Sequence, residues 1–289
     1  MESISPIIYI LGIAQDAGCP SALCQKTCCK NIPLTSCFYA TSFALIIPKG
    51  SENEVILFDC TPDFKYQMMK LQSIINFSKI SAVFLTHAHI GHCLGLINFG
   101  REVLNTNNLD VYCFERMNDF LTKNGHYSQL VKLNNIKLNP LFEEKPVKID
   151  ENVQITPFLV KHRGEFSETC GFRITGPKKS VIYLPDIDDL KEQNVDFKLI
   201  IKNNDMIFLD GTFFNEKEIG ACRNVKEIPH PFVEDSMKFF ENFEVAERNK
   251  INFIHFNHTN GCLKENTEER KQVLEKGYQI AKQFDAFEI

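Results

Sequence analysis

The sequence predicts an α/β protein built of stacked layers of strands and helices. Short apolar runs alternate with longer segments that mix polar and apolar residues, which is the pattern of strands followed by helices. The 289 residues contain no obvious repeat, low-complexity tract or linker rich in Pro and Gly. An apolar fraction of 44% is ordinary for a globular protein with a large core. We therefore expect a single α/β domain over residues 1–289.

Apolar runs with β-forming residues give the expected strands, and longer mixed segments give the expected helices. The strands are expected at Ile7–Leu11, Ser42–Ile47, Val55–Asp59, Ala82–Leu85, Val111–Cys113, Gln154–Val160, Gly171–Ile174, Ser180–Leu184, Met206–Leu209 and Asn252–His255. The helices are expected at Asp63–Asn76, His92–Glu102, Arg116–Lys123, Phe232–Glu241 and Thr267–Phe284.

Charge and hydropathy exclude several classes of partner. The net charge of −5 leaves no basic surface of the kind that binds nucleic acid. The apolar stretch near the N-terminus is short and lacks a preceding basic region, unlike a secretory signal. No run approaches the roughly 20 apolar residues of a membrane-spanning helix. We expect a cytoplasmic protein that acts on a small molecule, with a homodimer left open.

Three of the eight histidines lie in one short segment, FLTHAHIGHCLGL, directly after an apolar run. His87 and His89 are two residues apart on extended chain, so their side chains point to the same side and can hold one cation. His92 follows a turn and approaches the same pocket from the next helix. Imidazole suits zinc, iron and other first-row metals. A surface loop with three unrelated histidines is the alternative.

The spacing of these and later residues resembles the metallo-β-lactamase superfamily. That family carries HxHxDH after a strand, and then a His, an Asp and a final His. The corresponding residues here are His87, His89 and His92, followed by His162 in FLVKHRGEF, Asp186 in VIYLPDID and His255 in INFIHFNHTN. The resemblance covers nearly the whole chain. It implies a four-layer αββα sandwich and a centre in which Asp186 bridges two metal ions and takes part in catalysis.

One position departs from the family motif. The Asp inside HxHxDH, which binds the second metal in the family, is Gly91 here. A second metal would retain His92, His255 and the shared Asp186, and we expect it to bind more weakly; a single metal is the alternative. Asp188 offers a nearby carboxylate. On this view, Gly91→Asp would raise the metal stoichiometry.

Within the superfamily, the chain is most similar to the group of pyrroloquinoline-quinone biosynthesis protein B. The similarity lies in the opening LGIAQDAGCPSALCQKTCC and in HRGEFSETCGFRITGP, LPDID, LDGTFF and HFNHTN. The biosynthesis protein carries acidic residues at the first two histidines of the motif, whereas this chain keeps His87 and His89. We therefore expect a hydrolase-like relative within that group.

Four cysteines crowd into the segment from Cys19 to Cys29. Thiolates this close together can hold zinc tetrahedrally and fix a loop. The segment also resembles a phosphodiesterase of bacterial phosphonate catabolism, in which three cysteines and a His three positions after the final active-site His bind zinc. That resemblance implies a structural zinc ion on Cys24, Cys28, Cys29 and His258, although the spacing differs. Free buried thiols and a redox role are the alternatives.

The remaining candidates surround this centre. The same phosphodiesterase implies that His230 protonates the leaving group; a loop or capping histidine is the alternative. Asp210 after an apolar run would orient a ligand imidazole or form a turn, and Thr86 and Asp59 are expected to have similar supporting roles. His126 matches no motif, and we expect it on the surface. The other seven cysteines are expected to pack.

These residues favour a metal-dependent hydrolase acting on a phosphodiester or a similar ester through a metal-bound hydroxide. We expect Zn²⁺ at the active site, with Mn²⁺ or Fe²⁺ as alternatives, and a second, structural Zn²⁺. Three histidines and a carboxylate also suit Fe(II), so an iron-dependent oxygenase of cofactor biosynthesis is the second hypothesis. A degenerate metal-binding scaffold is the third, because of Gly91.

Overall fold

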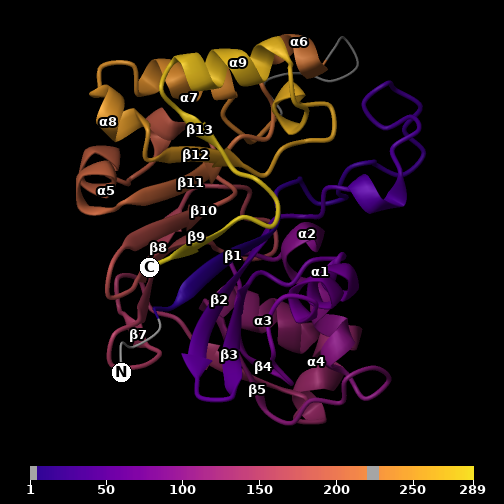
Figure 1. The fold of residues 1–289 in the computed structure, drawn as a ribbon. Helices are drawn as coiled ribbons and strands as arrows, with labels where there is room; N and C mark the ends of the chain where they lie inside the picture. The colour runs from indigo at the N-terminus through magenta and orange to yellow at the C-terminus, as the bar shows by residue number, and fades with distance from the viewer. Residues whose placement is uncertain (1–4, 220–227) are drawn as a thin grey trace.

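Two seven-stranded sheets lie at the centre of the computed structural model, which describes residues 5–219 and 228–289 (Figure 1). The first sheet has the order β14 (Ala286–Glu288), β1 (Ile7–Gly12), β2 (Ser42–Lys49), β3 (Glu52–Phe58), β4 (Ile80–Phe84), β5 (Leu109–Cys113) and β6 (Ile136–Pro140). The second has the order β13 (Gln279–Ile280), β12 (Ile251–Ile254), β11 (Met206–Asp210), β10 (Ser180–Leu184), β9 (Thr169–Thr175), β8 (Gln154–Val160) and β7 (Val147–Lys148).

Both sheets are mixed: each has parallel strands on one side and antiparallel strands on the other. Strands β3 to β6 run parallel, as do β10 to β13. The strands on the other side of each sheet pair antiparallel. Loops that follow the carboxyl ends of parallel strands are the usual place for a ligand site in α/β proteins.

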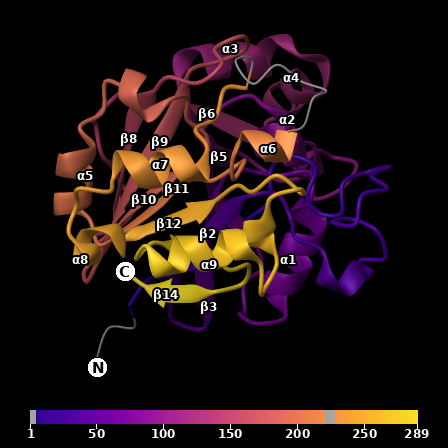
Figure 2. The same ribbon diagram turned by 90° about the horizontal axis from the view of Figure 1, so that it is seen from above.

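Helices cover the outer face of each sheet (Figures 1 and 2). The first sheet is covered by α1 (Phe64–Gln72), α2 (Ile90–Cys93), α3 (Glu115–Lys123) and α4 (Gly125–Lys132). The second is covered by α5 (Phe197–Asn203), α7 (Val233–Phe239), α8 (Val245–Arg248) and α9 (Glu268–Glu275), with α6 (Glu216–Ile219) beside them. Short 3₁₀ helices occupy Leu34–Ser36, Leu94–Phe99, Leu190–Glu192 and Gly261–Leu263. The predicted four-layer αββα sandwich is confirmed.

Strand periodicity explains why the sheets are buried on both faces. In β1, Ile8 and Ile10 point into the core between the sheets, whereas Tyr9 and Leu11 pack against the helices of the first sheet. Successive side chains of a strand alternate between faces, so a strand with layers on both sides is apolar at every position. This is the continuous apolar pattern that marked the strands in the sequence.

The predicted helix Thr267–Phe284 is only half correct. Helix α9 ends at Glu275, and Gly277 follows it in the left-handed region with φ of +84°. The backbone N–H of Tyr278 donates to the carbonyl of Val273, which is a glycine-dependent helix end. The chain then forms β13 in one sheet and β14 in the other (Figure 1).

Other differences concern short elements. The predicted helix His92–Glu102 is one α-helical turn followed by a 3₁₀ helix. Helices α4, α5, α6 and α8 and strands β6, β7, β13 and β14 were not predicted. Within the two described ranges, no helix has the length and apolar character needed to cross a membrane.

Candidate metal centre

The predicted site residues converge at one end of the two sheets, where strands finish. His87 follows β4, Asp186 follows β10 and His255 follows β12. His162 comes two residues after β8, which lies beyond β9 in the second sheet. Each sheet therefore supplies part of the site. The backbone of His255 is left-handed, with φ of +65°, a conformation costing about 1–3 kcal/mol that is concentrated at functional sites.

His87, His89 and His162 form the first group of ligand atoms, which all lie within 4.8 Å of one another. The Nε2 of His87 is 2.8 Å from the Nδ1 of His89. Their alternation along an extended segment brings both rings to one side, as the HxH spacing predicted. This geometry offers one face of a tetrahedral or larger coordination shell.

His92 and His255 form a second group next to the first, and Asp186 lies between the two. One oxygen of Asp186, Oδ2, is 2.9 Å from His92 Nε2 and 3.3 Å from His255 Nε2. The other, Oδ1, is 3.6 Å from His162 Nε2. A carboxylate whose oxygens face different histidine groups has the arrangement of a bridging ligand.

The atoms that face this centre are buried, and among the described residues their close polar neighbours are other candidate metal ligands. They are Nε2 of His92, Nε2 of His162, Nε2 of His255 and Oδ2 of Asp186. Leaving such an atom unpaired costs about 1–3 kcal/mol, and native proteins avoid it. A cation in each of the two groups would satisfy all four. The residues present therefore fit the metal that the motif implies.

The opposite sides of these side chains are held by buried polar groups. Asp59 accepts from the Nδ1 of His92 at 2.8 Å and from the hydroxyl and the backbone N–H of Thr86. The Thr86 hydroxyl lies 3.0 Å from His87 Nδ1. Asp188 lies 3.1 Å from His162 Nδ1, so it supports that ring rather than facing the second group. Such outer contacts fix ligand orientation.

Asp210 supports two further imidazole rings of the site, those of His230 and His255. Its Oδ1 accepts from the hydroxyl of Thr212, which lies 3.0 Å from His255 Nδ1. Its Oδ2 is 2.7 Å from the Nδ1 of His230. His230 also comes within 3.7 Å of Asp186. Asp210 thus joins His230 to His255. Its Oδ1 also accepts from the backbone N–H of Thr212 at 2.9 Å, so its contacts suit both the supporting role and the turn that the sequence allowed.

Burial and charge set the protonation of the histidines. Burial lowers the pKa of His87 and His255, and burial followed by the charge of Arg163 lowers the pKa of His89 to about 4. These rings are therefore neutral, which is the form that binds metal. Burial opposes a charge on His92 and His230 as well, but neighbouring carboxylates outweigh it and raise both pKa values.

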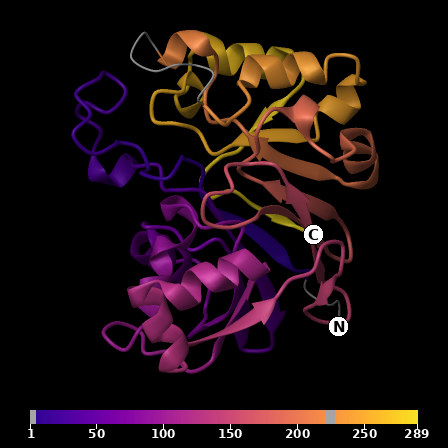
Figure 3. The ribbon, with the colours of Figure 1, turned by 180° about the vertical axis from the view of Figure 1, so that it is seen from behind.

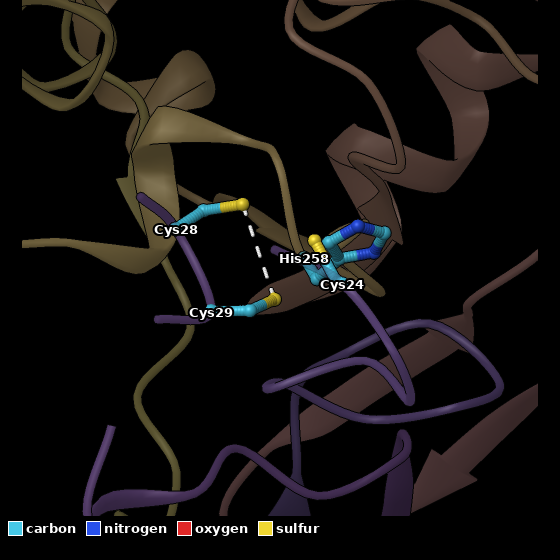
Figure 4. Close-up of side chains that lie close together, drawn as sticks. All are labelled: Cys24, Cys28, Cys29 and His258. Atoms are coloured by element: carbon cyan, nitrogen blue, oxygen red, sulfur yellow. Dashed lines mark hydrogen bonds between the residues drawn. The ribbon is translucent and has the colours of Figure 1, made fainter. Parts of the chain in front are cut away.

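A separate group of possible metal ligands, the cysteine cluster, contains Cys24, Cys28, Cys29 and His258 (Figure 4). Their ligand atoms lie within 4.8 Å of one another. The three sulfur atoms point toward a common centre, with the His258 ring against Cys24 (Figure 4). The loop that carries the cysteines projects from the side of the two sheets (Figures 1 and 3). Despite its departure from the expected spacing, the sequence brings together the predicted set of four.

A cavity of about 650 Å³ opens over the histidines. It is lined by His89, Asp186 and His230, and also by two basic side chains, Lys26 and Arg163. Lys26 belongs to the cysteine loop, between Cys24 and Cys28. The site therefore combines carboxylates and imidazoles at its base with positive charge at its wall.

Several side chains lie outside both groups. His126 is exposed, as expected. Six of the other cysteines are buried free thiols, Cys19, Cys60, Cys93, Cys113, Cys170 and Cys262, whereas Cys37 is half-buried. Cys222 lies outside the described residues. Asp16 was missed from the sequence, although its carboxylate lies within 4.8 Å of the ligand atoms of His92 and His255.

Known proteins match most of this chain. A family model described as a beta-lactamase superfamily domain matches residues 54–256. Coenzyme PQQ synthesis protein B of Acinetobacter baumannii (strain SDF) is 23% identical and covers 98% of this chain and 99% of its own. The same name belongs to a relative from Nitrosococcus oceani, which is 24% identical over 98% of this chain and 99% of its own.

Two solved structures share the fold. The Zn²⁺-bound PqqB from Methylobacterium extorquens is 19% identical, has a TM-score of 0.80 and covers 98% of this chain and 100% of its own. A diphosphatase from the PhnP family is 19% identical, has a TM-score of 0.71 and covers 99% of this chain and 98% of its own. At this identity the likeness shows the fold alone.

Proposed function

Because this chain belongs to the β-lactamase superfamily, in its PqqB-like branch, we propose that it is a metal-dependent hydrolase acting on a phosphodiester or a similar ester. One observation carries the proposal: buried ligand atoms from His92, His162 and His255 converge on Asp186, which lines an open cavity. Buried titratable side chains that converge beside a cleft are typical of a catalytic site.

The residues of the site have two kinds of role: some would bind metal ions, and His230 would transfer a proton. A bound divalent metal lowers the pKa of its water to about 7 and polarises a phosphoryl or carbonyl oxygen. Two groups could each hold a metal ion. One group contains His87, His89 and His162 on one side of Asp186, and the other contains His92 and His255 on the opposite side. Asp59 and Asp188 keep those rings in the orientation that binding needs.

His230 is placed to donate a proton to the leaving group. It lines the cavity, and Asp210 raises its pKa above the ordinary value. Its Nδ1 is held by Asp210, so its other ring nitrogen is the one left for substrate. A positioned acid of this kind contributes about 100- to 10,000-fold to a rate.

An anionic substrate agrees with the charge of the cavity wall. Lys26 and Arg163 line the cavity together with the carboxylates of Asp16, Asp186 and Glu218. The two basic side chains are groups that proteins use to bind phosphate, and metal ions on the carboxylates would add to their positive charge. The guanidinium of Arg163 lies 3.2 Å from His89 Nε2, at the edge of the first histidine group. A phosphate ester therefore suits the cavity better than a neutral ester.

The cysteine cluster would hold a separate structural zinc. Its three thiols and one imidazole are a closed tetrahedral donor set, which contributes to folding rather than to chemistry. The backbone near Lys26 lowers the pKa of Cys24, whereas burial raises that of Cys28 to about 11. A reducing cytoplasmic compartment would keep such thiols available for metal.

A second candidate function is an iron-dependent oxygenase. It is favoured by the relatives named coenzyme PQQ synthesis protein B, which match 98% of this chain. Three imidazoles and a carboxylate also suit Fe(II) with open positions. Metal identity and the reaction catalysed separate the two.

The test is turnover after loading with a single metal. Protein loaded with Zn²⁺, Mn²⁺ or Fe²⁺ is assayed with bis(p-nitrophenyl) phosphate, with p-nitrophenyl acetate and for oxygen consumption. We expect release of p-nitrophenolate from the phosphodiester, lost in Asp186→Asn and kept in the surface variant His126→Ala. Oxygen consumption with Fe²⁺ alone would favour the oxygenase, and inertness toward every probe with metal bound would favour a non-catalytic scaffold.

A further inference from the structure

Gly91 and Asp16 compete for the same space. A Cβ atom at Gly91 would lie 2.1 Å from the Oδ1 of Asp16 and 2.7 Å from its Cα. Real Cβ atoms do not approach other atoms so closely, so a side chain at residue 91 and the observed position of Asp16 exclude each other. The position at which the family motif carries a carboxylate is thus filled by a carboxylate from elsewhere in the chain.

The Asp16 carboxylate faces the second histidine group. Its Oδ1 is 3.6 Å from His92 Nε2 and 4.0 Å from His255 Nε2. Atoms bound tetrahedrally to a metal at about 2.1 Å lie about 3.4 Å apart, and these distances are near that value. Both imidazole nitrogens are buried, and the carboxylate of Asp186 is their close polar neighbour among the described residues. Asp16 therefore adds a fourth donor to the group of His92, His255 and Asp186.

The backbone holds Asp16 at this place from both sides. Phe256, the neighbour of His255, donates to the carbonyl of Ile13 and accepts from the N–H of Gln15, at 2.9 and 2.8 Å. The N–H of Gly18 then donates to the Gln15 carbonyl, closing a turn around Asp16. Gly18 is left-handed, with φ of +68°, which suits glycine. The loop of Asp16 is thus tied to the strand end that delivers His255.

We propose that Asp16 is the carboxylate ligand of the second cation, in place of the aspartate that residue 91 lacks. This rests on the proposed metal centre. The second position then has Asp16, His92, His255 and the shared Asp186. This proposal replaces the expectation that Gly91 weakens the second position: Gly91→Asp should not raise the stoichiometry, because the introduced side chain would displace the carboxylate of Asp16.

The experiment is titration of Mn²⁺ into protein whose histidine centre has been emptied, with free Mn²⁺ followed by electron paramagnetic resonance. Carboxylate and imidazole sites accept Mn²⁺, whereas thiolates select other metals, so the cysteine cluster does not count. We expect two ions per wild-type chain with a spin-coupled signal. Asp16→Asn, which keeps the shape of the side chain, should weaken the second ion by about 100-fold or more and leave an uncoupled signal.

Two further variants separate ligation from other effects. Glu165→Gln removes a charge beside His89 but none from the second group, and it should keep both ions. Gly91→Asp should bind no more Mn²⁺ than wild type and should melt at a lower temperature. Metal-free Asp16→Asn should melt like metal-free wild type, which shows that the variant is folded.

Two outcomes would overturn the assignment: two tightly held ions in Asp16→Asn, or a gain of one ion in Gly91→Asp. Phosphodiester hydrolysis by wild type is measured on the same samples. Inert protein that still binds two ions in an Asp16-dependent manner would refute the proposed function and keep the ligand assignment, so the two failures are distinguishable.

Discussion

The histidine centre and the cysteine cluster both gather metal-ligating atoms, but they differ in what holds those atoms in place. The histidine rings are held by the buried side chains of Asp59, Thr86 and Asp210. Each of these is hydrogen-bonded to an imidazole ring of the site. The cysteines have weak sulfur contacts, such as the 3.9 Å between the sulfurs of Cys28 and Cys29. The fold pre-organises the first site, whereas we expect the second to depend on a bound metal for its order.

The largest expected effect is loss of an imidazole from the first group. His87→Ala or His162→Ala should remove most of the active-site metal and lower turnover about 1,000-fold or more, since the metal supplies several kcal/mol of transition-state stabilisation. Elemental analysis and phosphodiester turnover test this beside His126→Ala. Full metal content with wild-type turnover in both variants would refute the assignment.

The next effect separates proton donation from metal binding. His230→Gln should lower turnover about 100-fold or more for a substrate with a poor leaving group, such as an alkyl phosphodiester. The loss should be much smaller for p-nitrophenolate, which leaves without a proton. Rates with both substrates, at unchanged metal content, give the test. An equal loss for both leaving groups would argue against an acid role.

A smaller effect is expected from the buried support of the histidines. Asp59→Asn keeps the size of the side chain but removes its charge behind His92 and Thr86. Metal affinity of the histidine centre should fall about 10- to 100-fold, measured by competition with a chelator, while zinc in the cysteine cluster stays. Equal loss of both metals would mean that Asp59 acts on the fold as a whole.

The smallest effect on turnover is expected at the cysteine cluster. The comparison is between His258, which belongs to that cluster, and His255, which lies three residues earlier and belongs to the histidine centre. His258→Ala should release one zinc and lower the melting temperature while the folded protein keeps its substrate affinity. His255→Ala should abolish turnover with a smaller loss of stability. Metal analysis and melting curves of the two variants are compared with activity. A catalytically dead His258→Ala at full stability would place His258 in the active site.

Local patterns predicted most of the fold and most of the site. The HxHxxH segment, and single residues at strand ends such as Asp186 and His255, lie where their sequence context predicted. Asp16 was missed because nothing near it in sequence marks it as a ligand. It meets His92 only through the bonds of its loop to Phe256. The sequence offered only an indirect signal for Asp16. The motif lacks its usual carboxylate at Gly91, which suggests that another part of the chain supplies one.

The errors in secondary structure have a similar origin. The segment after Glu275 has a composition that a helix tolerates, but Gly277 ends the helix, and the residues that follow pair with both sheets. β14 pairs with β1 from the opposite end of the chain, and no local pattern encodes such a partner. Tertiary pairing overrides local preference at these places.

The most direct test of the account is a crystal structure of the zinc-loaded protein, with anomalous scattering measured on both sides of the zinc absorption edge. We expect three peaks. One lies among His87, His89, His162 and Asp186. A second lies among Asp16, His92, His255 and Asp186, and a third among Cys24, Cys28, Cys29 and His258. Absence of a peak beside Asp186, in a protein with zinc bound at the cysteines, would contradict the central claim that this end of the sheets is a metal centre.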